Sequence, residues 1–276
     1  MRPEFLAPGS PWPVQTLSYG SDPEQFGQLR TPPAGSVPVS VVILVHGGYW
    51  RSRWRLDLMD PLAADLARHG IASWNIEYRR PDRHGWDATT TDVEAAVRHL
   101  DRLAVRYPVD LARVILVGHS AGGQLAMRVA ADLLTPVLPA AAPPADALLA
   151  DAGAVRPAVV VSLAGVLDLA EAQRRGLSDG AVAAALGGTS AELPDVYAAA
   201  SPLQRLPLGI PQLIVTARND TAVPNELSDR YAAAARAAGD PITAIQGEGD
   251  HFTLIDPASL LWTDTCLQML AALDNP

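Results

Sequence analysis

A serine flanked by glycines follows an apolar run, in the sequence Gly118-His119-Ser120-Ala121-Gly122. Residues 114–117 before it are Val-Ile-Leu-Val and residues 124–130 after it suit a helix, which predicts a strand, a sharp turn and a helix. Strand and helix would approach so closely that side chains at 118 and 122 would collide, which explains the two glycines. The serine would stand at a helix N-terminus, where N–H groups favour developing negative charge. The pattern predicts an acyl-transfer nucleophile.

An aspartate and a histidine follow two later strands of the chain. Asp220 comes after the apolar run 212–217, and His251 comes after the run 242–245. Because the carboxyl ends of parallel strands share one edge of a sheet, we expect both side chains near Ser120. His251 would accept the Ser120 proton and pass it to the leaving group, while Asp220 would hold the correct imidazole tautomer.

Each of these residues also has a structural interpretation. Asp220 alone could cap a helix, and His251 alone could be a surface residue of a loop. Asp168, after the apolar run 159–163, and Asp250 are rival acids for the triad. The order serine, aspartate, histidine at successive strand ends favours catalysis, with Asp220 as the acid.

A glycine pair follows another strand, in the sequence His46-Gly47-Gly48-Tyr49-Trp50. Glycines at this position let backbone N–H groups point inward. We expect the N–H groups of Gly48 and Tyr49, with that of Ala121, to bind the substrate carbonyl oxygen as it becomes an oxyanion. We expect His46 to support the loop and to take no proton.

Strands and helices alternate along most of the chain, which predicts an α/β fold with a mainly parallel sheet flanked by helices. Strands are expected at 14–20 and 25–30, as an antiparallel edge pair, and at 39–45, 71–78, 114–117, 159–163, 212–217 and 242–245. Helices are expected at 57–69 and 91–107, directly after Ser120, and at 226–238 and 257–273. We expect one domain over 1–276, with 165–206 as a small helical cap and the Ala/Pro-rich 135–157 as a surface insertion.

Composition limits the classes of partner and cofactor. The 276 residues carry a net charge of −9, which argues against nucleic acid or an anionic membrane as partner. A single cysteine, Cys266, and no apolar leader predict a cytoplasmic protein without an intrachain disulfide. The sequence lacks metal-ligand and nucleotide-binding motifs, so we expect neither metal nor cofactor.

From about residue 16 to the last helix, the chain resembles the α/β-hydrolase superfamily of serine hydrolases. Residues 46–50, together with Gly118 to Gly123, resemble the kynurenine formamidase (arylformamidase) branch, which has Tyr-Trp where hormone-sensitive-lipase-type esterases have a third glycine. This resemblance implies hydrolysis of N-formyl-L-kynurenine to formate and kynurenine, a step of tryptophan catabolism. The alternatives are a general short-chain carboxylesterase and, from another class, a non-catalytic binding module.

The expected partner is a small ester or amide, and a homodimer is a further expectation. Trp50 and Phe252 are expected to contact substrate, because aromatic rings suit a flat leaving group. Trp54 and Trp86 are expected in the core. Arg51 and Arg53 are both expected in solvent-exposed positions, although the amino-acid end of N-formyl-L-kynurenine would need a polar anchor.

Overall fold

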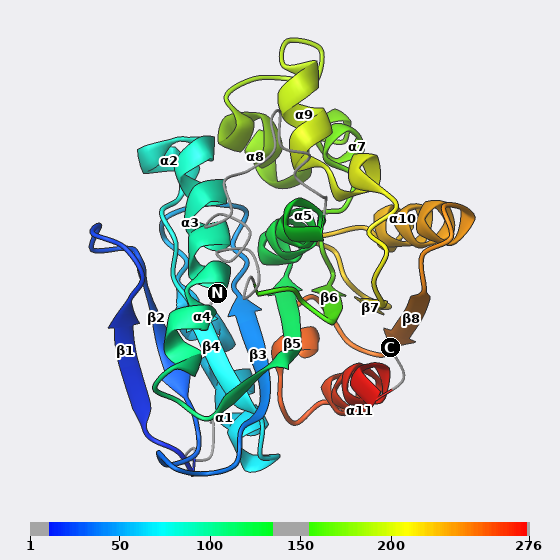
Figure 1. Cartoon of the computed structure of the whole chain (residues 1–276). Coiled ribbons are helices and arrows are strands. Elements are labelled where there is room, and N and C mark those ends of the chain that lie inside the picture. The colour runs from blue at the N-terminus through cyan, green and yellow to red at the C-terminus, as the bar shows by residue number, and fades with distance from the viewer. Residues whose placement is uncertain (1–10, 135–154, 275–276) are drawn as a thin grey trace, which may run out of the picture.

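The computed structural model describes residues 11–134 and 155–274 and contains one eight-stranded sheet (Figure 1). The strand order across the sheet is β1-β2-β4-β3-β5-β6-β7-β8. The strands are β1 (Val14–Ser18), β2 (Phe26–Arg30), β3 (Val39–Val45), β4 (Ala72–Ile76), β5 (Val109–His119), β6 (Val159–Leu163), β7 (Gln212–Ala217) and β8 (Ile242–Gly247). β1, β2 and β4 pair antiparallel, and all pairs from β4 to β8 are parallel. The predicted fold class and edge pair are confirmed.

Helices cover both faces of the sheet. They are α1 (Asp60–Arg68), α2 (Pro81–His84), α3 (Trp86–Arg98), α4 (Leu100–Ala104), α5 (Ala121–Leu134), α7 (Leu169–Arg174), α8 (Leu177–Leu186), α9 (Pro194–Ala200), α10 (Asn225–Ala237) and α11 (Leu260–Asp274), with 3-10 turns η1 (Leu56–Met59), η2 (Pro202–Arg205) and η3 (Thr253–Ile255). Alternate residues of a strand face opposite sides. Val41 and Ile43 of β3 therefore join a core with α3 and α5, whereas Val42 and Leu44 join a second core with α1 and α11.

The central strands read as continuous apolar runs because both faces of the sheet are covered. Residues 41–45 of β3 and 114–117 of β5 are fully buried. β5 begins at Val109, earlier than predicted. The sequence did not indicate this start because residues 110–113 are partly exposed and lack the apolar pattern of a buried strand. The predicted helix 91–107 is likewise two helices, and α3 starts directly after Gly85, whose φ of 80° ends α2.

The segment 165–206 contains α7, α8, α9 and η2 and, as described, no strand. These short helices lie together beyond one end of the sheet, at the top of Figure 1, on the side where β5 leads into α5. The segment 165–206 therefore lies beyond the end of the sheet at which the chemistry is expected, and its role as a cap stays a prediction. Most of the predicted insertion 135–157 lies outside the described residues.

Candidate active site

Ser120 occupies the turn between β5, which ends at His119, and α5, which begins at Ala121. Its φ of 56° lies in the left-handed region, where a residue other than glycine is strained by about 1–3 kcal/mol. The surrounding sheet enforces this conformation, because the Ser120 N–H donates to Leu163 O at 2.8 Å. The local geometry is the strained strand-to-helix turn that the sequence predicts.

Two glycines allow this turn to form. A Cβ atom at Gly118 would lie 2.1 Å from Gly122 O, and one at Gly122 would lie 2.1 Å from Val45 O. Both clashes are with backbone, which cannot move aside easily. The predicted clash between strand and helix is confirmed for Gly118, whereas glycine at position 122 is required by the close approach of α5 to the end of β3.

Asp220 and His251 are brought together by the loops that follow β7 and β8. The two side chains form a hydrogen bond of 2.7 Å between His251 Nδ1 and Asp220 Oδ2. The other carboxylate oxygen of Asp220 accepts from the N–H groups of Ala222 and Val223 at 2.8 and 3.0 Å. Since a carboxylate only accepts, Nδ1 carries the proton, and Nε2 is the nitrogen left for a base. His251 and Ser120 line the same pocket.

The charge of Asp220 is stabilised inside the protein. Burial by itself raises the pKa of this carboxyl, but the hydrogen bond and charge of His251 and the two backbone N–H groups outweigh burial. The pKa of Asp220 is therefore below its ordinary value. An ionised, fixed Asp220 is what an imidazole needs in order to become positively charged during catalysis.

The rival acids lie elsewhere and have other partners. Asp168 caps α7 by accepting from the Glu171 N–H at 3.1 Å, and it pairs with Arg230 at 3.1 Å. Asp250 accepts from the N–H groups of Phe252 and Thr253, each at 3.0 Å, and so closes its own turn. Of the three acids, Asp220 is the one hydrogen-bonded to His251.

His119 contacts both the ring and the backbone of His251, and the sequence analysis did not predict this contact. The two imidazole rings lie 4.5 Å apart, and His119 Nε2 donates to the backbone O of His251 at 2.9 Å. Burial, together with the nearby His251, lowers the pKa of His119 to about 3. A neutral His119 thus ties the loop of the candidate base to the candidate nucleophile. Its position beside Ser120 was the available signal.

The loop after β3 follows an unusual backbone path. Gly48, Tyr49 and Trp50 have positive φ angles of 118°, 49° and 55°. Among hydrogen bonds between described residues, none uses the backbone N–H of Gly48, Tyr49 or Ala121. Ala121 is also the first residue of α5, where helical N–H groups have no intrahelical acceptor. These donors suit the predicted oxyanion hole.

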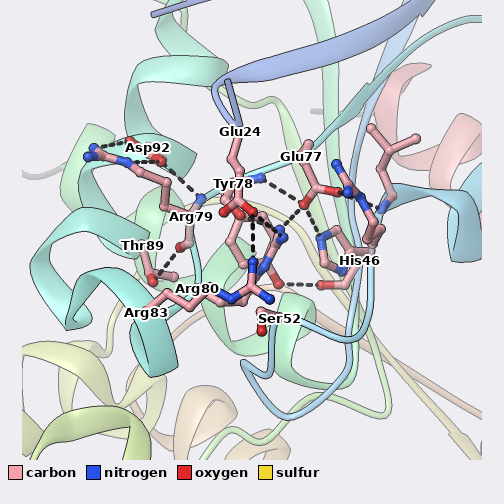
Figure 2. Close-up of polar contacts among 12 residues, drawn as sticks. Glu24, His46, Ser52, Glu77, Tyr78, Arg79, Arg80, Arg83, Thr89 and Asp92 are labelled. Atoms are coloured by element: carbon pink, nitrogen blue, oxygen red, sulfur yellow. Dashed lines mark hydrogen bonds and ion pairs between the residues drawn. The ribbon is translucent and has the colours of Figure 1, made fainter. Parts of the chain in front are cut away.

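A buried carboxylate anchors this loop from behind (Figure 2). Glu77 is fully buried and contacts His46 Nε2 at 3.0 Å and Arg55 Nε at 3.2 Å, and it also pairs with Arg80. His46 Nδ1 lies 2.8 Å from Gly47 O, and the Tyr78 hydroxyl donates to His46 O at 2.8 Å. His46 therefore has the architectural place predicted for it. Glu77 was not predicted, although a lone acid ending an apolar strand was a usable signal.

Trp50 does not lie where we expected. Its side chain is 1% exposed, its Nε1 donates to Gln124 Oε1 at 3.0 Å, and its ring packs edge-on against Trp86. The left-handed backbone turns this ring away from the pocket and onto α5. Trp50 is a core residue, so the expected substrate contact is wrong in geometry, whereas Trp86 packs against the core as expected.

The candidate catalytic residues open into a pocket of about 250 Å³. Its lining, as far as described, consists of Gly48, Tyr49, Arg53, Trp54, Leu58, His119, Ser120, Ser178, Ala222, His251 and Phe252. Phe252, which was predicted to contact substrate, belongs to this lining. Arg53 is exposed, as predicted, and also borders the pocket, as does Trp54, which packs against the second core. The Tyr49 hydroxyl donates to Ala222 O, and burial, reinforced by Asp220, raises the pKa of Tyr49 to about 12. The phenol therefore stays protonated.

The described residues hold neither a candidate metal site nor a candidate membrane span. No group of three or more histidine, cysteine, aspartate or glutamate residues among them is arranged to hold a metal ion. No helix within 11–134 or 155–274 is both long and apolar enough to cross a membrane.

Comparison with solved structures shows which fold surrounds this pocket. Esterase B from Lactobacillus rhamnosis superposes with a TM-score of 0.78 at 22% identity, covering 96% of this chain and 85% of that one. A truncated carbohydrate esterase from gut microbiota also gives 0.78, at 20% identity, covering 98% and 100% of the two chains. The esterase Est2 from Thermogutta terrifontis gives 0.70 at 23% identity, covering 95% and 91%. The fold is that of an α/β-hydrolase.

Sequence comparison identifies the family. The family model described as BD-FAE matches residues 28–234, more than half of the chain. The protein therefore belongs to the BD-FAE family. Carboxylesterase NlhH from Mycobacterium tuberculosis is 31% identical over 115 residues, which cover 40% of this chain and 35% of that enzyme. The match thus spans about a third of the relative's length.

Proposed function

We propose that the protein is a serine hydrolase that cleaves small esters through an acyl-enzyme on Ser120. The observation that carries this proposal is the 2.7 Å bond from His251 to Asp220, formed beside a pocket that Ser120 and His251 both line. A non-catalytic binding module would have no need for a strained serine, a fixed imidazole tautomer and unused backbone donors in one place.

The proposed reaction follows from the position of each group. Ser120 Oγ attacks the ester carbonyl carbon as His251 Nε2 takes the hydroxyl proton, and Asp220 stabilises the resulting imidazolium. The backbone N–H groups of Gly48, Tyr49 and Ala121 stabilise the oxyanion. The tetrahedral intermediate then expels the alcohol, which receives the proton from His251. Water, activated by the same imidazole, attacks the acyl-enzyme and releases the acid.

The size of the pocket favours short acyl groups. Its volume of about 250 Å³ lies below the roughly 300–1,000 Å³ typical of sites for drug-sized ligands. Tyr49, Trp54 and Phe252 give it aromatic walls that suit a flat or apolar group. The similarity to carboxylesterase NlhH, and to an esterase B inhibited by a tributyrin phosphonate, points to ester cleavage as well.

Formamidase activity is a finer hypothesis for the same site. The aromatic walls would accept the aryl group of N-formyl-L-kynurenine, and a formyl group is the smallest acyl group. The Tyr49-Trp50 pair, however, gives this hypothesis less support than expected, because Trp50 is buried in the core. Carboxylesterase activity is therefore our main proposal, and kynurenine formamidase is the second.

One set of assays tests both proposals. We expect kcat/KM for 4-nitrophenyl acetate or butyrate to exceed that for the octanoate by about tenfold or more. The octanoyl chain is too long for the pocket, so its outer methylene groups would remain in contact with water. N-formyl-L-kynurenine is assayed in parallel, with Ser120→Ala as the blank for every substrate. Preference for the octanoate would overturn the short-chain proposal. Formamide hydrolysis faster than acetate hydrolysis would replace it with formamidase.

A further inference from the structure

We propose that this pocket selects substrates that carry a carboxylate, and that Arg53 binds this group. The inference rests on the proposed hydrolase function and specifies its substrate class. Arg53 lines the pocket that contains Ser120 and His251. An arginine at that place is a specificity-determining residue, because a guanidinium binds carboxylates through paired N–H donors.

Two successive backbone turns bring Arg53 to the pocket. The Arg51 N–H donates to Gly48 O at 3.1 Å, and the Trp54 N–H donates to Arg51 O at 3.1 Å. The chain therefore folds back, and a Cβ atom at Gly48 would lie only 2.4 Å from the Trp54 Cβ. Residues 53 and 54 thus return to the rim directly beside the proposed oxyanion loop, so the position of Arg53 is tied to the reacting centre.

Aromatic stacking orients the guanidinium at this rim. Arg53 Cζ lies over the Trp54 ring, 5.8 Å from its centroid. A cation within about 6 Å of a tryptophan ring centroid is attracted by the ring face, and this contact holds the guanidinium beside the rim. The N–H donors of a guanidinium can pair with a carboxylate. Stacking also reduces the freedom lost when a substrate binds. The Arg53–Trp54 pair is therefore suited to hold an anionic group.

The neighbouring arginines have structural tasks. Arg51 donates to the backbone O of Ser178 in the cap at 2.5 Å, and Arg55 pairs with the buried Glu77 at 3.2 Å. Within the segment from Arg51 to Arg55, Arg53 is the arginine that lines the pocket.

Arg53 contributes positive charge to the lining of the pocket. No carboxylate belongs to the lining in the part of the chain that the structure describes, and Arg53 is its arginine. The protein as a whole carries a net charge of −9, which repels anions at long range. A local cation beside the reacting centre offsets this repulsion, so its removal is expected to affect anionic substrates selectively.

The experiment compares charged and neutral esters of similar shape. In the first pair, 4-nitrophenyl hydrogen glutarate carries its carboxylate on the acyl chain, and 4-nitrophenyl valerate is the neutral control. In the second pair, 4-acetoxybenzoate carries it on the leaving group, and methyl 4-acetoxybenzoate is the control. Each pair is assayed with the full chain and with Arg53→Gln, Arg53→Lys and Arg102→Gln. Arg102 is an exposed arginine of α4, so Arg102→Gln is a control that changes the net charge by the same amount as Arg53→Gln.

We expect Arg53→Gln to lower kcat/KM for one of the anionic esters by about fivefold or more, mainly through KM, as for a partly exposed charge-assisted hydrogen bond. The matched neutral ester should change by less than about twofold, because it makes no such bond. Arg53→Lys should retain part of the preference, and Arg102→Gln all of it. Raising the salt concentration should weaken the preference in the unchanged protein.

Two results would overturn the inference. One is equal loss of activity toward charged and neutral esters in Arg53→Gln, which would make Arg53 a structural residue. The other is an unchanged ratio of anionic to neutral kcat/KM. Failure of the unchanged protein to hydrolyse any of the neutral esters would count instead against the proposed hydrolase function.

Discussion

The hydrogen bond from His251 Nδ1 to Asp220 decides which imidazole nitrogen is available to Ser120. It leaves Nε2 as the proton acceptor, and the backbone N–H groups of Ala222 and Val223 hold the carboxylate in place. Asp168 and Asp250 are also aspartates near strand ends, yet Asp168 caps the N-terminus of α7 and Asp250 stabilises a turn. At this scale, function follows from the partner of each carboxylate.

Asp220→Asn should therefore cripple the proposed activity. The amide would stabilise the wrong imidazole tautomer, and we expect kcat to fall by up to about 10⁴-fold with the fold intact. Steady-state rates on 4-nitrophenyl acetate measure the effect. Asp168→Asn and Asp250→Asn serve as matched controls, and each should retain most of the activity. Loss of activity in either control with a healthy Asp220→Asn would reassign the acid.

His119 makes stability depend on pH. Unfolded, its imidazole protonates near the ordinary pKa of about 6.5, whereas burial and His251 lower the folded pKa to about 3. Between these values the unfolded state binds more protons, so this contribution is complete above pH 6.5 and is lost as pH falls toward 3.

His119→Gln should flatten this dependence. Because glutamine does not titrate, the free energy of unfolding should change between pH 6 and pH 4.5 by as much as about 2 kcal/mol less than in the unchanged protein. Urea unfolding of both proteins at several pH values measures the two slopes. Equal slopes in that interval would show that His119 is protonated in the folded protein.

The loop from His46 to Trp50 shows how a buried charge positions an element. Glu77 joins this loop, through His46, to Arg55 and Arg80 (Figure 2). Tyr78 ties the same loop to β4, since its hydroxyl donates to His46 O at 2.8 Å. This network fixes His46, two residues before Gly48, and we propose that it positions the backbone donors of the proposed oxyanion hole.

Glu77→Gln should destabilise the protein and slow catalysis together. Removing the Glu77 charge leaves the buried Arg80 with Glu24, at 3.4 Å, as its remaining counter-charge, and we expect a loss of about 2–4 kcal/mol, which is near or below the roughly 3–5 kcal/mol of a fully broken buried pair. Urea unfolding and kcat on 4-nitrophenyl acetate measure the two effects. The exposed pair Glu94–Arg98 offers a control, because Glu94→Gln should change stability by less than about 1 kcal/mol. A Glu77→Gln protein as stable as that control would contradict the anchoring role.

The sequence predicted the elements whose patterns are locally complete. Buried strands such as 41–45 are apolar throughout, and the glycine at 118 has a steric reason that requires no knowledge of the rest of the fold. The direction of Trp50 was not predictable, because it depends on three successive left-handed residues. Arg53 and Trp54 reach the pocket through two turns whose hydrogen bonds have no sequence signature.

At the scale of the whole molecule, the sheet gathers residues that are far apart in the chain. Gly48, Ser120, Asp220 and His251 follow β3, β5, β7 and β8, and because these strands are parallel, all four residues follow the same end of the sheet. The helices of 165–206 lie beyond one end of this sheet (Figure 1). In the proposed mechanism this assembly supplies the nucleophile, the base and the oxyanion donors. The charge of the whole protein, in contrast, affects only how ligands approach.

We therefore expect chelators to leave hydrolysis unchanged. Assays on 4-nitrophenyl acetate after dialysis against EDTA, with and without added divalent ions, measure this directly. Activity within about 20% of the untreated protein is the expected result, since the proposed chemistry uses side chains and backbone N–H groups only. Inhibition that added metal reverses would require a different mechanism.

Covalent labelling of Ser120 tests the central claim most directly. A fluorophosphonate should form one adduct per chain, because the serine oxygen attacks phosphorus and displaces fluoride, and activity should fall in proportion. Peptide mass spectrometry should place the adduct on Ser120. Ser120→Ala should take up no label and lose about 10⁴-fold or more in kcat, with unchanged circular dichroism. An adduct on another residue, or a Ser120→Ala protein with a tenth of the original activity, would contradict the account.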